Sequence, residues 1–311
     1  MTSTLSRSLF EIGPFIGRYP KPDSLGKALS NLRLSGDTNA GLQSMAIPRR
    51  YIECTALVAL WIACGEVFEL STPAYALLGV PLIAVFQLAV VRKPICNLWV
   101  READRFRLDR WGILIAIGLM VVPAHSAYKE SSIMWRLVDL CGVVGAPFAA
   151  FALRSQSSRK LKEAFPSFGA TVLIGGSSMA MRFISKGLSP GFKASFLLGN
   201  SVLIFPMLFV LEEVAFRGAL DGHIMRAQGK RLSEWGSAMF VSVLWALWHL
   251  PVAHGITGWW LVRLAGSLLV GQILVGVPLS FCWRKSGTLV LPAAAHALLD
   301  AYRNAITGGP R

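Results

Sequence analysis

Charged residues are scarce in this chain. Only 15% of its 311 residues are Asp, Glu, Lys or Arg, whereas 54% are hydrophobic. Soluble domains carry about 25% charged residues, and disordered chains combine low hydrophobicity with high net charge. The composition therefore excludes a disordered chain and favours a protein whose surroundings are mainly lipid.

Acidic residues are the rarer of the two signs, since 17 Asp and Glu stand against 31 Lys and Arg, and the formal net charge is +14. An excess of cations can indicate a nucleic-acid partner, but membrane proteins also collect Lys and Arg on their cytoplasmic loops. With so many apolar residues, we expect the lipid bilayer as the partner and no nucleic acid. Nothing in the sequence predicts an oligomeric state.

The five cysteines lack the spacing of a disulfide framework or of a Cys-based zinc site. We interpret them as small buried residues. Residues 1–50 contain no early apolar run, so we expect no secretory signal peptide there. They are polar and basic, which predicts a cytoplasmic tail near anionic lipid.

From residue 51 onward, apolar stretches long enough to cross a bilayer follow one another. The loops between them alternate: residues 92–110 and 154–162 are rich in Lys and Arg, whereas residues 71–73 and 254–258 carry none. This alternation predicts a multi-pass protein of a bacterial inner membrane with a cytoplasmic N-terminus. The expected fold is an all-α, polytopic transmembrane helix bundle of eight or nine spans, near 52–70, 74–91, 112–128, 132–153, 168–184, 195–219, 236–253, 259–281 and 288–306.

Two adjacent carboxylates, Glu212 and Glu213, follow an apolar run in the sixth of these spans. A charge at mid-bilayer costs about 2.5–3.5 kcal/mol, so each needs an explanation. Neighbouring residues on a helix point about 100° apart, so we do not expect the two carboxylates to share one environment. Arg217 lies four residues after Glu213, which predicts an ion pair on one helix face and leaves Glu212 without an intrahelical partner. Asp221, at the end of the span, is interpreted as solvated.

Two histidines lie in later spans. His249 follows Trp245 by four residues and His296 precedes Asp300 by four, so each pair shares a helix face. Singly, a histidine in a bundle is more often a core residue than a catalyst. Counting about 1.5 Å per residue from the membrane surface places Glu212 and His249 at nearly one depth and His296 at a similar level. Three ionisable groups at one depth indicate a functional site.

Such groups suit hydrolysis by direct attack of water. A carboxylate and a neutral imidazole can hold a water molecule and remove its proton, and a second imidazole can stabilise the developing oxyanion. No Ser or Cys stands in a recognisable nucleophile setting. Glu212 and the two histidines could instead bind a divalent metal such as zinc, but the His-Glu-x-x-His helix of zinc proteases is absent. No cofactor is firmly predicted, and zinc remains an alternative.

Three motifs carry a resemblance to a known family: Glu-Glu-x-x-x-Arg at 212–217, Trp-x-x-x-His at 245–249 and His-x-x-x-Asp at 296–300. Together they resemble the motifs of the CAAX protease and bacteriocin-processing (CPBP) family, intramembrane proteases that include the Ras-converting prenyl endopeptidases. The resemblance covers residues 200–305, about a third of the chain. It implies a CPBP-like catalytic core at 195–306, in the C-terminal half, preceded by accessory transmembrane helices at 51–194.

The resemblance also implies roles for the motif residues. Glu212 and His249 would activate the water, His296 and Asp300 would line the oxyanion site, and the site would be supported by Glu213, Arg217 and Trp245. Two residues depart from the family pattern. Trp245 stands where Phe is usual, a change that we expect to affect packing only. Asp300 stands where Asn is common, and an ionised Asp cannot donate to an oxyanion, so it would orient His296 or stay protonated.

The leading hypothesis is therefore a glutamic-type intramembrane endopeptidase, metal-dependent or not, that cleaves a membrane-associated CAAX-type, leader or sorting-signal peptide. One alternative is a non-proteolytic immunity or scaffold protein of the same fold. Another is a transporter with a buried proton relay, which would require paired broken helices at mid-membrane. The sequence does not choose among the substrates.

Overall fold

The computed structural model describes residues 38–185, 194–225, 233–252 and 259–307 of the chain. The chain divides into two units, Met1–Ala46 and Ile47–Arg311. Most of the basic tail predicted at residues 1–50 lies outside the described residues, as does the uncharged loop predicted at 254–258.

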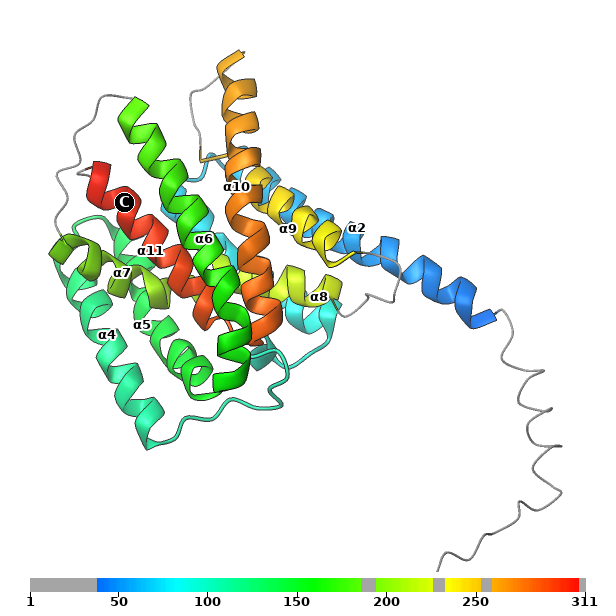
Figure 1. Cartoon of the computed structure of the whole chain (residues 1–311), viewed down its shortest axis with the longest axis horizontal. Coiled ribbons are helices and arrows are strands. Elements are labelled where there is room, and N and C mark those ends of the chain that lie inside the picture. Colours follow the sequence, from blue (N-terminus) through cyan, green and yellow to red (C-terminus); the bar gives the residue numbers. More distant parts are fainter. Residues whose placement is uncertain (1–37, 186–193, 226–232, 253–258, 308–311) are drawn as a thin grey trace, which may run out of the picture. The chain divides into compact units, whose positions relative to one another are not determined.

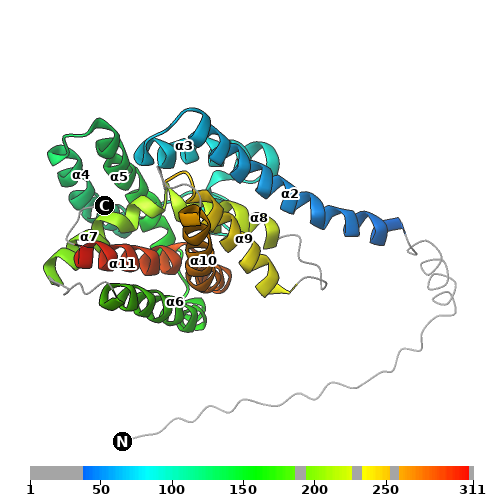
Figure 2. The same ribbon diagram turned by 90° about the horizontal axis from the view of Figure 1, so that it is seen from above.

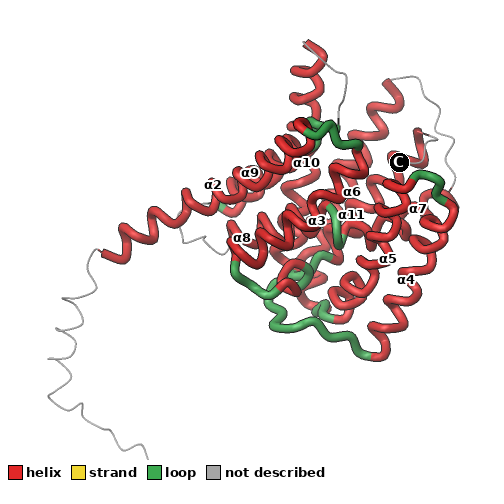
Figure 3. Tube along the Cα trace, turned by 180° about the vertical axis from the view of Figure 1, so that it is seen from behind, coloured by secondary structure: helices red, strands yellow, loops and turns green. Residues whose placement is uncertain are grey.

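Every regular element within the described ranges is a helix, which confirms the predicted all-α fold. No strand occurs in those ranges, and one isolated antiparallel bridge joins Val100 to Thr288. Figure 3 shows the same helical composition from behind. In chain order the elements are α2 (Thr38–Val67), α3 (Thr72–Val85), the π-helix η1 (Phe86–Val91), the 3₁₀-helix η2 (Ile95–Leu98), α4 (Arg110–Lys129), α5 (Ile133–Arg154), α6 (Ser158–Ser185), α7 (Ala194–Leu208), the π-helix η3 (Val214–Asp221), α8 (Gly222–Met225), α9 (Glu234–Trp248), α10 (Trp259–Ser286) and α11 (Val290–Thr307).

Four of the described helical segments are long and apolar enough to cross a bilayer. They are Thr72–Val91, Arg110–Lys129, Ile133–Arg154 and Ala265–Ser286. Each overlaps one of the predicted spans. The remaining spans, and the total of eight or nine, stay predictions.

The helices of the C-terminal half surround α11. This helix contacts α6, α7 and α10, and α10 also packs on α6 and α9 (Figure 1). On the side of α7 away from α11, α5 packs against α7 and pairs with α4 (Figure 2). The largest core cluster includes the buried rings of Trp61, Phe216, Trp245 and Trp283. Because α9 and α10 also contact η3, which follows α7 in the chain, these helices and α11 pack around the segment between α7 and α8.

Local sequence features explain where several helices begin and approach one another. Asp109 caps α4 by accepting a hydrogen bond from the Gly112 amide at 2.7 Å, and Ser233 caps α9 in the same way. Gly145 of α5 lies against the carbonyl of Pro206 in α7, where an added Cβ would stand 1.9 Å from that oxygen. Only glycine allows this close packing of α5 on α7.

The sixth predicted span, 195–219, is interrupted within its range rather than formed by one continuous helix. Helix α7 ends at Leu208, a turn follows, and helical structure resumes at Glu212 as the approach to the π-helix η3. The amide of Phe209 bonds to the Pro206 carbonyl three residues earlier, at 3.2 Å. Pro206 has no N–H to donate to the Val202 carbonyl, and the bond of Phe209 to a carbonyl three residues earlier marks the tightened last turn of α7. The break places Glu212 at the start of a new segment.

Candidate active site

One cavity collects the predicted site residues from three separate parts of the chain. Glu212 precedes η3, His249 directly follows α9, and His296 and Asp300 lie on α11; all four line a cavity of about 1170 Å³. Most of the other lining residues are apolar, including Leu203, Met207, Val270 and Leu299. The depth argument from the sequence brought the same groups together.

His296 occupies the centre of the charged groups. Its Nδ1 donates to Glu213 Oε1 at 2.8 Å, and its Nε2 lies 3.9 Å from Glu212 Oε2 and 3.5 Å from Asp300 Oδ2. The two adjacent glutamates therefore lie near one imidazole, but their environments differ as expected: Glu212 lines the cavity, whereas Glu213 is completely buried beside Arg217. The common neighbour comes from α11, which helix periodicity within one segment cannot reveal.

Glu213 also forms the ion pair that the spacing predicted. Arg217 Nη1 lies 3.2 Å from Glu213 Oε1, and both side chains are completely buried. The guanidinium stacks 4.3 Å from the ring of Trp245, and its Nη2 lies 3.5 Å from the carbonyl of Gly276 in α10. Removing one partner of such a buried pair costs about 3–5 kcal/mol. The pair thus fixes η3 against α9 and α10.

Trp245 connects the first two motifs. Its indole Nε1 donates to Glu212 Oε2 at 3.0 Å, and its carbonyl accepts from His249 Nδ1 at 2.8 Å. Its ring meets the imidazole of His296 edge-on, at 5.1 Å between centroids. The expectation that tryptophan at this position affects packing only was wrong, because phenylalanine has no N–H to donate to a carboxylate.

The bond from His249 to the Trp245 carbonyl determines which nitrogen of the imidazole carries a proton. A carbonyl oxygen accepts only, so Nδ1 carries the proton and Nε2 of the neutral ring carries the lone pair. The side-chain amide nitrogen of Gln272 lies 3.3 Å from this Nε2. Gln272 lines the same cavity from α10 and was missed in the sequence. In the sequence, the feature that could have indicated Gln272 is a single side-chain amide within the apolar run Leu-Val-Gly-Gln-Ile-Leu-Val.

Asp300 has two neighbours. Its Oδ1 lies 3.0 Å from Arg303 Nη1, and its Oδ2 lies 3.5 Å from His296 Nε2. Glu213 is the closer partner of His296, at 2.8 Å. We expected Asp300 to orient His296, but Glu213 is the carboxylate nearest to that imidazole. The charge of Asp300 is balanced by the guanidinium of Arg303.

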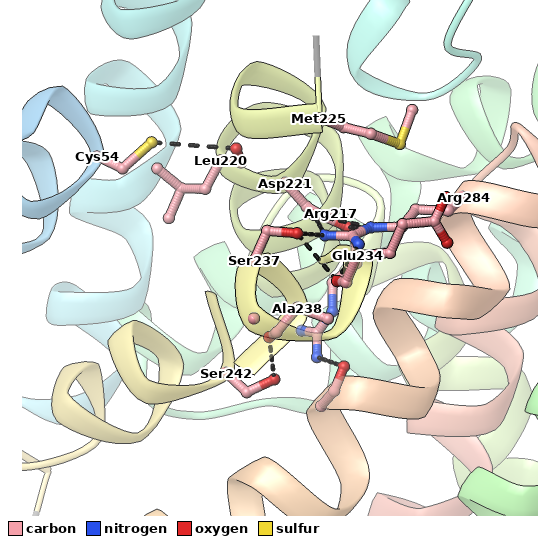
Figure 4. Close-up of polar contacts among 12 residues, drawn as sticks. Cys54, Arg217, Leu220, Asp221, Met225, Glu234, Ser237, Ala238, Ser242 and Arg284 are labelled. Carbon is pink, nitrogen blue, oxygen red and sulfur yellow. Dashed lines mark hydrogen bonds and ion pairs between the residues drawn. The ribbon is translucent and has the colours of Figure 1, made fainter. Parts of the chain in front are cut away.

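A second buried ion pair supports η3 from the other end. Asp221, which we expected to be solvated, is completely buried and pairs with Arg284 of α10. Figure 4 shows this pair with Ser237, whose hydroxyl lies 3.0 Å from Arg284 Nη2. The expectation failed because α9 and α10 close over the end of η3. Neither Asp221 nor Arg284 lines the cavity.

The zinc alternative requires several side chains placed to bind one metal ion. Within the described residues, no group of three or more His, Cys, Asp or Glu side chains is arranged to hold a metal ion. Glu213 is engaged by Arg217 and Asp300 by Arg303. The described site residues therefore do not fit the zinc alternative.

Comparison with known proteins gives one match. Residues 194–302 match the family model described as type II CAAX prenyl endopeptidase Rce1-like. The chain thus contains an Rce1-like domain, which confirms the predicted resemblance to the CAAX protease and bacteriocin-processing family. The match covers about a third of the chain and includes all three motifs. Neither the curated proteins nor the solved structures gave a match.

Proposed function

We propose that the protein is an intramembrane endopeptidase that hydrolyses a peptide bond with a water molecule activated by Glu212 and His249. The Rce1-like match supports a protease of the CAAX type in a membrane-embedded family. The observation that carries the proposal is the convergence of Glu212, His249 and His296 on one largely apolar cavity.

The proposed reaction begins with water held between the Glu212 carboxylate and His249 Nε2. Nε2 offers a lone pair because Nδ1 donates to the Trp245 carbonyl. The water oxygen bonds to the carbonyl carbon of the substrate, and its proton passes to one of these two bases. The carbonyl oxygen becomes an oxyanion, which His296 Nε2–H stabilises.

Collapse of the tetrahedral intermediate completes the cleavage. The carbon–nitrogen bond breaks, the carbonyl re-forms, and the proton held by the base passes to the leaving amine. Glu213 holds Nδ1 of His296 throughout, which keeps Nε2 directed at the reacting carbonyl. The Asp300 carboxylate lies 3.5 Å from His296 Nε2 and supports the imidazolium charge by its proximity.

The substrate class follows from the lining of the cavity. Apolar side chains from α7, α10 and α11 surround the charged centre, which suits a peptide presented by the membrane. The family description names CAAX prenyl endopeptidases, so a prenylated C-terminal peptide is the first substrate to test. Leader and sorting-signal peptides are the other members of the proposed class.

The topology is part of the proposal. We propose nine spans with the N-terminus in the cytoplasm of a bacterial cell, residues 51–194 as accessory helices and residues 195–306 as the catalytic core. The alternating basic loops support this orientation. Single cysteines introduced at residues 105 and 256 of a cysteine-free variant test it. A membrane-impermeant thiol reagent applied to whole cells should label position 256 alone, and labelling of position 105 would contradict the orientation.

The activity is tested in cells that carry the wild-type chain, Glu212→Gln or His249→Ala. Comparison of their membrane proteomes should reveal an uncleaved precursor in both variants. Purified wild-type protein should then cleave that precursor, and a prenylated CAAX peptide with a fluorophore and quencher serves as a parallel probe. Normal processing by both variants would exclude the proposed catalysis and favour an immunity or scaffold protein.

A further inference from the structure

The charged centre of the cavity contains few hydrogen-bond donors for an oxyanion. Trp245 Nε1 already donates to Glu212, and His249 Nδ1 already donates to a carbonyl. Asp300, paired with a guanidinium, accepts hydrogen bonds and donates none. His296 Nε2 is the donor that remains among these motif residues. Preorganised donors aimed at the developing charge are a large source of catalytic power in water-excluded sites.

Gln272 supplies a further donor from a helix outside the three motifs. Its side-chain nitrogen lies 3.3 Å from His249 Nε2 and 3.5 Å from His249 Nδ1. Nδ1 donates to the Trp245 carbonyl, so Nε2 is the ring nitrogen that can accept from the amide. The amide is half-buried and lines the cavity. It sits in an apolar stretch, where an amide without a partner would be costly.

The position beside His249 decides what this amide can do. In the proposed reaction, His249 holds the water that attacks the carbonyl carbon, so the carbonyl oxygen must lie within a few ångströms of that imidazole. A donor in contact with the same imidazole can reach the oxygen. Entry of the substrate would draw the amide N–H from His249 Nε2 to the carbonyl, which frees Nε2 for the water.

We propose that Gln272 is a further catalytic residue, whose side-chain amide donates to the carbonyl oxygen of the scissile peptide bond together with His296. The proposal rests on the proposed endopeptidase function. It assigns no new bond change: the amide keeps both of its protons and stabilises the oxyanion formed by the attack of water. The Gln272 amide also supplies a hydrogen-bond donor, which the Asp300 carboxylate cannot.

Gln272→Leu tests the role with little change in volume and with an apolar residue suited to the helix. We expect kcat to fall about 10²- to 10³-fold, as for removal of one oxyanion donor, with KM within about threefold. The matched control is Gln87→Leu, the same substitution in η1. Gln87 does not line the cavity, and its amide donates to the Pro94 carbonyl at 3.0 Å, so the kcat of the folded protein should change less than threefold.

A second measurement separates catalysis from packing. A phosphinic peptide that mimics the tetrahedral intermediate should bind the Gln272→Leu variant at least tenfold more weakly than the wild type. The substrate peptide should remain uncleaved in Glu212→Gln. It should bind equally well to this variant and to the double variant that adds Gln272→Leu. Equal weakening for both ligands, or an unchanged kcat in Gln272→Leu, would overturn the proposal. If the wild type were as inactive as Glu212→Gln, the proposed function itself would fall and this proposal with it.

Discussion

The indole Nε1 of Trp245 lies 3.0 Å from Oε2 of Glu212, although 33 residues separate them in the chain. The carbonyl of the same tryptophan accepts from His249 Nδ1. One residue of α9 therefore positions both groups that are proposed to activate the water. Its ring also stacks on the Arg217 guanidinium, so the support of the first motif depends on the side chain of Trp245 and the base of the second on its backbone carbonyl.

Trp245→Phe should lower the rate while leaving the fold intact. It keeps an aromatic ring beside Arg217 but removes the N–H together with the second ring of the indole, so a control for ring size is needed. A hydrogen bond to a charged group contributes about 1.5–3 kcal/mol, so we expect kcat to fall about 10- to 100-fold. Steady-state kinetics on the precursor or on the prenylated probe measures the change.

The control for this variant is Trp248→Phe. Trp248 lines the same cavity and its ring stands 5.0 Å from that of His249. Its indole nitrogen, however, is buried without a hydrogen-bond partner among the described residues. Loss of that N–H should leave kcat nearly unchanged. Equal losses in the two variants would mean that ring size rather than the bond to Glu212 controls the rate.

The buried pair of Glu213 and Arg217 should dominate the stability of the motif region. Arg217→Met leaves the Glu213 carboxylate buried without its guanidinium, at a cost of about 3–5 kcal/mol. Thermal unfolding in detergent micelles should show a large loss for this variant. The double variant Glu213→Gln with Arg217→Met should be less destabilised than Arg217→Met, because no uncompensated charge remains. A double variant that is less stable than Arg217→Met would contradict this account.

The sequence predicted those features that depend on spacing along one helix. The ion pair of Glu213 and Arg217 is of this kind, because residues four apart meet on one helix face. Counting helix rise predicted that Glu212, His249 and His296 lie at similar depths, and all three line one cavity. The all-α fold followed from composition and apolar length.

The contacts that were missed depend on packing between segments. His296 lies near both glutamates because α11 packs against the segment that begins at Glu212. The bond from Trp245 to Glu212 depends on the angle between α9 and η3. The sequence shows Gln272 only as a polar residue in an apolar run. Local sequence patterns do not predict which helix such a residue faces.

Asp221→Asn should affect stability rather than catalysis. The change leaves Arg284 without its buried counter-charge, and removing one partner of a buried pair costs about 3–5 kcal/mol. Because neither residue lines the cavity, the kcat of the folded fraction should match the wild type. The double variant Asp221→Asn with Arg284→Met should regain part of the lost stability. A fall in kcat at full folding would show that this pair is coupled to the site.

Chelation should leave the activity unchanged. In the proposed reaction Glu212 and His249 remove the proton of the water directly, and the described site residues do not form a three-ligand group. Glu213 is held by Arg217 and Asp300 by Arg303, at 3.2 and 3.0 Å, so recruiting either as a ligand would require breaking an ion pair. We therefore expect purified enzyme to keep its kcat after dialysis against EDTA and after treatment with 1,10-phenanthroline. The control is a zinc peptidase inactivated under the same conditions. Loss of activity that added zinc restores would replace direct water activation with a metal-dependent mechanism.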